Sequence, residues 1–346
     1  MANELSDFIA GSPINQWRGI VLFGRNVASY KFALAKSLLD LGREQKEEVS
    51  LAELSVPFSR YLCEHIKEVD TQGTSPQSRP LDACRFYNAG KINSEELLSI
   101  IELLGFNDVI DAFHNVGPGE VATKFYIDER NTRINGIRLT DSIFKLSESF
   151  QTNNLYGEVE SRWNLVEEAW SKKADGKQSR VLYESSKELL IPALKGKRHS
   201  ITEVRPALNG YQKGHCFYCF RRITIFKLAE IDRCHVDHFL PHSLMARGFP
   251  LDLDKVWNLV LSCPECNLSK SSRLPDPNEY LERLNKRNNF LISSHHPLRE
   301  TLISETRNSP KERILFLRKA FEKAFEIYGA TVNDGWKTKN MSPPLF

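Results

Sequence analysis

The chain has 346 residues, of which 41% are hydrophobic, 26% charged and 10% aromatic, and this composition is typical of a folded globular protein rather than a disordered one. Its formal net charge of +3 permits a polyanionic partner without requiring one. The first twelve residues include acidic side chains and lack the basic and apolar regions of a secretion signal, and the longest apolar runs are too short to span a bilayer. We therefore expect a cytoplasmic protein of about two domains with no membrane partner.

Apolar side chains recur every three or four positions through much of the first two hundred residues, and this period predicts helices. The predicted helices cover residues 28–44, 51–68, 156–171 and 180–194. Pro57 falls inside the second of them, where it delays or kinks the helix because proline cannot donate to the helical ladder. Another helix opens at Asn93-Ser94-Glu95-Glu96, with Ser94 as its cap.

A hairpin and a loop interrupt these helices. Residues 124–127 and 134–139 have the composition of strands, and Asn135-Gly136 is a strong tight-turn signal, so we predict one β-hairpin. Residues 71–80 are polar and rich in breakers, which predicts an exposed loop. Nothing in the first two hundred residues resembles a catalytic constellation. Target selection, a partner surface and oligomerisation all stay open as roles for this part.

Four of the seven cysteines form two close pairs, Cys216-x2-Cys219 and Cys263-x2-Cys266. The three that stand apart are Cys63, Cys84 and Cys234. An odd total without a secretion signal argues against a disulfide framework and for reduced thiols. Two thiol pairs at this spacing are typical of a structural zinc site, so we predict that all four paired cysteines bind one Zn²⁺.

Between the cysteine pairs lies an acid–imidazole dipeptide, Asp237-His238. Residues 223–226 and 234–240 are predicted strands, and Pro241 ends the second because it lacks a ladder donor. Successive side chains of an ideal strand point to opposite faces, so Asp237 and His238 can serve one site only if the backbone twists or leaves the sheet there.

The second cysteine pair opens a predicted helix, capped by Ser262 or Cys263, with Pro264 at its first position. Asn267 lies one residue beyond the last cysteine, about 100 degrees round the helix, so this helix can offer an amide oxygen to a neighbouring metal. Lys270 follows three residues later, in a suitable place for a cation that contacts a phosphate.

Two further helices are predicted after the motif. A charged helix covers residues 278–289, and a last helix covers residues 310–328. The tail from residue 331 onward includes Pro343 and Pro344, and we expect it to be loose.

Residues 211–275 resemble the HNH endonuclease family, whose ββα-metal fold sits between two zinc-binding CxxC pairs. The matching motifs are Asp237-His238-x2-Pro241, Asn258-Leu259 and Cys263-x2-Cys266-Asn267-x2-Lys270. This resemblance implies that Asp237 and Asn267 bind one catalytic Mg²⁺ (or Mn²⁺). It also implies that His238 is the general base for the attacking water and that Asn258 orients His238.

Together with the helical periodicity of the first half, the resemblance predicts an α+β protein, with a mainly helical domain of unknown role over residues 1–197 and an HNH nuclease domain with C-terminal helices over residues 198–346. The expected activity is hydrolysis of DNA, one strand per active site, leaving a 5′ phosphate and a 3′ hydroxyl. Lys270 and Arg273 are the predicted contacts with DNA. Family habit suggests anti-phage defence in bacteria, with other proteins of a defence system as partners. The alternative is a non-catalytic zinc module that binds nucleic acid or protein.

Overall fold

Helices dominate the chain, and the strands form only small sheets. The computed structural model describes residues 2–75, 77–174, 181–184, 189–192, 202–226, 233–294, 297–331, 334–339 and 341–344. Over the N-terminal half the elements are α1 (Ala2–Ile9), α2 (Pro13–Phe23), α3 (Tyr30–Arg43), β1 (Glu48–Ser50), α4 (Leu51–Glu68), α5 (Arg79–Asn88), α6 (Ser94–Leu104), α7 (Val109–Ala112), β2 (Asn115–Val116), β3 (Gly119–Glu120), β4 (Tyr126–Glu129), β5 (Gly136–Leu139), α8 (Asp141–Glu148) and α9 (Thr152–Ala174).

The C-terminal half contains the shorter elements of the motif and three longer helices. Its elements are β6 (Val181–Glu184), β7 (Leu189–Pro192), β8 (Thr202–Glu203), α10 (Val204–Asn209), η1 (Gly210–Gln212), β9 (His235–His238), η2 (His242–Arg247), η3 (Val256–Asn258), β10 (Leu259–Ser262), α11 (Pro264–Lys270), α12 (Pro277–Ser293), α13 (Arg299–Thr306) and α14 (Pro310–Tyr328). The predicted α+β class is confirmed. None of the described helices is long and apolar enough to cross a membrane.

Several of the predicted helices begin at a residue whose side chain caps the first turn. Ser50 forms a capping box with Glu53 at the start of α4, and the helix continues through Pro57. At α6 the cap is Asn93 rather than Ser94, because the Asn93 side chain accepts from the backbone N–H of Glu96. The predictions of α3, α4, α6, α9 and α14 as helices are confirmed.

The prediction of a helix over residues 180–194 is wrong. β6 and β7 lie there instead, paired antiparallel with Val181 opposite Pro192, and residues 185–188 lie outside the described part. The short aliphatic run Leu189–Ile191 satisfies either period, and pairing with neighbouring strands decides its conformation. The predicted hairpin is confirmed as β4 and β5, although its connection is longer than two residues, since Glu129 pairs with Gly136.

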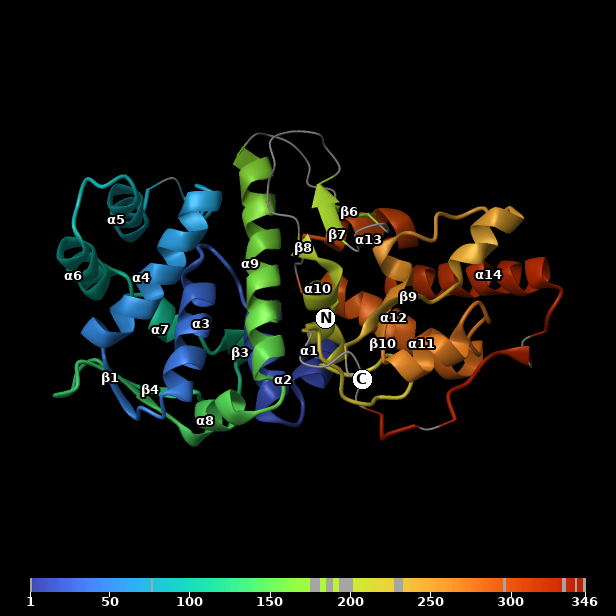
Figure 1. Ribbon diagram of the computed structural model, residues 1–346, viewed down its shortest axis with the longest axis horizontal. Helices are drawn as coiled ribbons and strands as arrows, with labels where there is room; N and C mark the ends of the chain where they lie inside the picture. Colours follow the sequence, from blue (N-terminus) through green and yellow to red (C-terminus); the bar gives the residue numbers. More distant parts are fainter. Residues whose placement is uncertain are drawn as a thin grey trace.

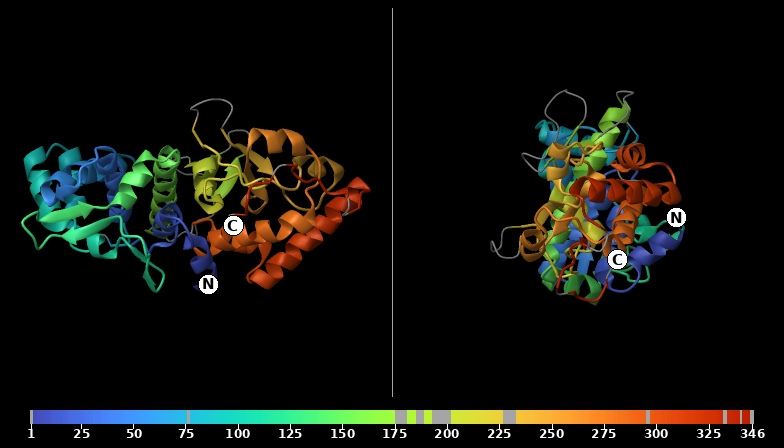
Figure 2. Two further views of the ribbon diagram at one scale, coloured as in Figure 1. Left: turned by 90° about the horizontal axis from the view of Figure 1, so that it is seen from below. Right: turned by 90° about the vertical axis from the view of Figure 1, so that its right-hand side faces the viewer.

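Helix α9 stands at the centre of an elongated molecule (Figures 1 and 2). Elements α3 to α8 lie on one side of it, and the later elements from α10 to α14 lie on the other. The first helix joins the two sides: the ring of Phe8 lies 5.1 Å from that of Phe290 on α12. A buried ion pair, Arg18 to Glu158 at 2.8 Å, ties α2 to α9. The domain boundary after residue 197 stays a prediction.

The C-terminal half contains the predicted β–β–α order, with one correction in the first strand and one in the tail. β9 and β10 pair antiparallel and α11 follows directly. Residues 223–226 form no strand, because Thr224 makes only an isolated bridge to Arg233. The expectation of a loose tail is wrong for residues 334–339. Trp336 is buried there, and its backbone N–H donates to the carbonyl of Leu274 at 2.8 Å.

Candidate active site and zinc centre

The two cysteine pairs meet in one buried cluster. The four Sγ atoms of Cys216, Cys219, Cys263 and Cys266 all lie within 4.8 Å of one another, and the distance from Cys219 to Cys263 is 3.7 Å. Tetrahedral zinc with bonds of about 2.3 Å to sulfur places its ligands about 3.8 Å apart. The four thiols therefore fit the two zinc-binding pairs that the sequence predicts.

The first cysteine pair lies on a tight turn over residues 216–220, here called the zinc turn. Backbone geometry and contacts with helix α12 fix its conformation. Phe220 adopts a left-handed conformation (φ 58°), which lets its N–H donate to the carbonyl of Cys216 at 3.1 Å. Arg283 of α12 donates from Nη1 to the carbonyls of Phe217 and Tyr218 at 2.6 and 2.8 Å. The turn is thereby fixed independently of the thiols that it presents.

The second pair is placed by the start of α11. Cys263 is the N-cap, and its Sγ accepts from the backbone N–H of Cys266 at 3.5 Å. This confirms the predicted helix start. A capping amide stabilises negative charge on the Cys263 sulfur, which is the form that binds zinc.

Asp237 is held between the zinc turn and α11. It lies on β9 opposite Val260, and its side chain is buried. The hydroxyl of Tyr218 donates to Oδ2 of Asp237 at 2.6 Å, and Nζ of Lys270 lies 3.2 and 3.1 Å from Oδ1 and Oδ2. Lys270 also donates to the carbonyl of His238 at 2.8 Å. The carboxylate is therefore held by donors from two other segments, the turn of the first cysteine pair and α11.

Burial and the neighbouring carboxylate shift the pKa of both side chains that contact Asp237. Burial lowers the pKa of Lys270 from its usual value, and the neighbouring Asp237 charge opposes that shift. Burial and the same carboxylate raise the pKa of Tyr218 well above its ordinary value, so its hydroxyl stays a donor. An ionised carboxylate offers about four acceptor positions, so two donors leave positions for a divalent cation.

His238, the next residue, faces a loop that sequence reasoning did not single out. Its Nε2 lies 2.7 Å from Oδ1 of Asp254, and the imidazole is 19% exposed. His242 lies on the other side of the same carboxylate, with its Nε2 3.6 Å from Oδ2. An acid in the long connection between Asp237-His238 and Asn258 was the available signal, but nothing in its spacing singled out Asp254.

Asn258 ties the two ends of that connecting loop together. It is fully buried, its Nδ2 donates to the carbonyls of Leu240 and Leu253 at 3.0 Å, and its Oδ1 accepts from the N–H of Leu240 at 2.8 Å. These contacts set the backbone two residues after His238 and directly before Asp254. Asn258 therefore contacts the backbone on both sides of the His238–Asp254 pair, and its role in orienting His238 stays a prediction.

The remaining predicted residues lie on or after α11. Asn267 is half-buried, one turn before Lys270, and its side chain makes no hydrogen bond within the described residues. Lys270 is fully buried against Asp237, whereas the sequence suggested a position in contact with phosphate. Arg273 is exposed and donates to the carbonyl of Ser269.

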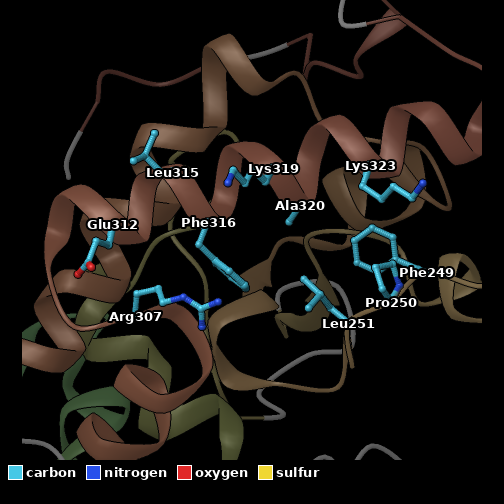
Figure 3. A pocket seen from close by; sticks show the side chains of 10 residues that line it. All are labelled: Phe249, Pro250, Leu251, Arg307, Glu312, Leu315, Phe316, Lys319, Ala320 and Lys323. Atoms are coloured by element: carbon cyan, nitrogen blue, oxygen red, sulfur yellow. The ribbon is translucent and has the colours of Figure 1, made fainter.

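A cavity of about 400 Å³ opens beside the loop that bears Asp254. Figure 3 shows Lys319 and Lys323 of α14 across from Phe249 and Leu251 of the loop. Arg307 adds a third cation to its lining. The catalytic candidates are not among its described lining residues, so this cavity lies beside the loop that bears Asp254 and is separate from the candidate active site.

The comparisons with known proteins agree with this geometry. Residues 216–276 match the model of a protein family described as HNH endonuclease, and this range includes both cysteine pairs and every catalytic candidate. The match covers the C-terminal half only in part and does not reach the N-terminal helices. No curated protein and no solved structure matches the chain.

Proposed function

We propose that the HNH domain in the C-terminal half makes this chain a metal-dependent endonuclease that hydrolyses the phosphodiester bonds of DNA. One active site attacks one strand at a time, so the expected event is a nick. The expected products are a 5′ phosphate and a 3′ hydroxyl. A place in anti-phage defence, with partner proteins, is proposed on the family resemblance alone.

Asp237 and Asn267 are the proposed ligands of one catalytic Mg²⁺ or Mn²⁺. Both offer oxygen atoms, the donors that these hard cations prefer, and few protein ligands leave room for water and phosphate. Their elements touch, because Lys270 at the end of α11 contacts Asp237 on β9. When bound, such an ion stabilises the charge of the attacked phosphate and of the departing oxygen.

His238 is the proposed general base. An ionised Asp254 can only accept a hydrogen bond, so Nε2 of His238 donates its proton and the basic lone pair lies on Nδ1. Nδ1 then takes a proton from the attacking water while Asp254 stabilises the imidazolium that forms. Asn258 supports this arrangement as a positioning residue, through the backbone on either side of the loop.

The observation that supports catalysis most directly is the His238–Asp254 pair next to a buried Asp237. A zinc module that only binds a partner needs the four cysteines and a surface. It does not need an imidazole oriented by a carboxylate beside a second carboxylate. The non-catalytic zinc module, binding nucleic acid or protein, is therefore the second candidate.

DNA contact is proposed for exposed cations around this site. Arg273 lies just after α11, and Lys319 and Lys323 line a cavity with Phe249 and Leu251 of the loop that bears Asp254. Contacts with phosphates release condensed counterions, so they make affinity depend on salt. The buried Lys270 is proposed to act on the substrate through Asp237 rather than by reaching into solvent.

A plasmid assay tests the proposal. Supercoiled DNA is incubated with the full chain and Mg²⁺ or Mn²⁺, and the nicked and linear forms are counted over time. His238→Ala should abolish cleavage and retain zinc and DNA binding. His235→Ala, on the same strand with its side chain exposed, should cut normally. Equal cutting by both variants would exclude His238 as the base, and DNA binding without any cutting by the wild type would favour the zinc module.

A further inference from the structure

A second cavity is lined mostly by residues of the N-terminal half, together with Pro297, and none of its described lining residues belongs to the nuclease motif. It measures about 740 Å³, within the range of about 300 to 1,000 Å³ that is usual for small-molecule sites. It is bounded by the end of α2, the start of α3 and one face of α9. Its described lining residues are Phe23, Gly24, Arg25, Asn26, Val27, Lys31, Ala112, Asn115, Gly117, Arg162, Val166, Ala169, Trp170 and Pro297.

Arg162 is a buried cation in this lining with unused donors. Its side chain is 3% exposed, and its Nη2 donates to the carbonyls of Leu22 and Ser294 at 3.1 and 2.9 Å. Its Nε and Nη1 are buried and have no hydrogen-bond partner within the described residues. A buried cation with unpaired donors is unfavourable unless an anion pairs with it and accepts its hydrogen bonds.

Lys31 brings a second buried cation to the same cavity. Its side chain is 6% exposed, and its Nζ lies 3.4 Å from the carbonyl of Asn115, a weak contact. Burial lowers the pKa of Lys31 to about 8, as expected for an ammonium without a carboxylate beside it. Arg25 is exposed at the rim. No acidic residue occurs among the described lining residues, so the charged side chains of the described lining are all cations.

The wall of the cavity formed by α9 also carries apolar side chains. Val166 and Trp170 are largely buried and follow Arg162 at four-residue intervals, so all three lie on one face of the helix. Phe23 adds a further aromatic side chain. The cavity therefore joins a cationic corner to an aromatic and aliphatic wall.

From this lining we propose that the cavity binds a small phosphorylated molecule with a flat organic part, a nucleotide in chemical class. The phosphate accepts hydrogen bonds from the free donors of Arg162 and pairs with the ammonium of Lys31. The base packs against Trp170. The guanidinium fork matches the geometry of a phosphate, which favours phosphate over a single carboxylate. This site is separate from the nuclease reaction and does not depend on it.

Binding is measured by calorimetry and by thermal shift with the full chain. The probes are AMP, GMP, the nucleosides adenosine and guanosine, and inorganic phosphate. We expect a nucleoside monophosphate to bind and to raise the melting temperature, and the nucleosides to bind at least tenfold more weakly. Failure of both nucleotides to bind, or equal affinity for nucleotide and nucleoside, would overturn the proposal. Equal affinity for inorganic phosphate and AMP would overturn the assignment of the flat organic part.

Variants locate the site. Lys31→Met and Arg162→Met should each weaken nucleotide binding by about tenfold or more, because each removes a charge-assisted contact. Arg133→Met, an 87% exposed cation in the same half, is the matched control and should bind normally. Unchanged nucleotide affinity in folded Lys31→Met would place any binding elsewhere.

Discussion

The hydroxyl of Tyr218, a residue inside the first cysteine pair, donates a hydrogen bond of 2.6 Å to Oδ2 of Asp237. The zinc turn and the proposed catalytic strand are thus in direct contact. Both atoms are buried, so the contact is shielded from water. A hydrogen bond to a buried charge contributes about 1.5 to 3 kcal/mol, which makes Tyr218 a positioning residue for Asp237.

Tyr218→Phe should therefore lower the free energy of unfolding by about 1 to 3 kcal/mol and weaken cleavage, while zinc content stays the same. Urea denaturation and the plasmid assay measure the two effects. Tyr280→Phe is the matched control, since its hydroxyl accepts from the N–H of Thr338 and lies in the same aromatic cluster. If both variants lose cleavage equally, the effect comes from packing rather than from Asp237.

Lys270→Met should destabilise the protein because it leaves the Asp237 carboxylate buried without its cation. Breaking a buried ion pair on one side costs about 3 to 5 kcal/mol. Lys323→Met removes an exposed pair with Glu326 and should change stability by less than about 1 kcal/mol. Denaturation with and without Mg²⁺ checks this. A Lys270→Met protein as stable as the wild type would contradict the ion pair.

Asp254→Asn should reduce kcat, with little change in KM or in folding. The pair with His238 is partly exposed, so its contribution to stability is small, but its loss removes the group that orients the base. General base catalysis contributes about 10²- to 10⁴-fold, which bounds the expected loss. Asp252→Asn, two residues earlier and more exposed, should retain full kcat. Equal kcat in the two variants would remove Asp254 from the mechanism.

Zinc removal should unfold the C-terminal half. Bound zinc contributes about 10 to 16 kcal/mol in finger peptides, comparable with the whole stability of a typical domain. Cys263→Ser should therefore lose zinc and melt far below the wild type, as measured by metal analysis and calorimetry. Cys63→Ser replaces a buried thiol outside the cluster and should keep its zinc. An unchanged melting temperature after stoichiometric zinc loss would show that the cluster is dispensable for folding.

Acid should destabilise the N-terminal half through His114. Burial, reinforced by the nearby Lys124, lowers the pKa of His114 to about 4, and its Nε2 accepts from the N–H of Phe125 at 3.0 Å. Its unfolded pKa is about 6.5, so between pH 6.5 and 4 only the unfolded chain binds the proton. Stability is then present above pH 6.5 and falls as the pH drops.

The decrease in the free energy of unfolding that His114 causes follows from the difference between its folded and unfolded pKa. It is about 1.4 kcal/mol for each tenfold change in proton affinity, or about 3 kcal/mol by pH 4. Urea denaturation at pH 7, 6, 5 and 4 measures it in the wild type and in His114→Gln. The variant should show a shallower decline with falling pH. Identical slopes would assign the decline to other groups.

Local signals in the sequence predicted the zinc site and the helix that closes it, because cysteine spacing and the cap at Cys263 depend on a few neighbouring residues. The orientation of Lys270 was not predictable, since its helix face is decided by packing of α11 against β9. Asp254 lies in a connection without periodicity, so only the folded loop brings it to His238. The burial of Trp336 was missed for a similar reason, because Tyr218 and Leu274, which it contacts, are distant from it in sequence.

The position of Phe8 matters for producing the C-terminal half as a separate fragment. Its ring packs against Phe290 of α12, and α12 also holds the zinc turn through Arg283. A fragment cut at residue 198 would uncover this aromatic contact on the helix that braces the cysteines. Excising the nuclease region alone therefore invites aggregation, and supplying the N-terminal peptide Ala2–Phe23 in trans is the natural way to rescue it.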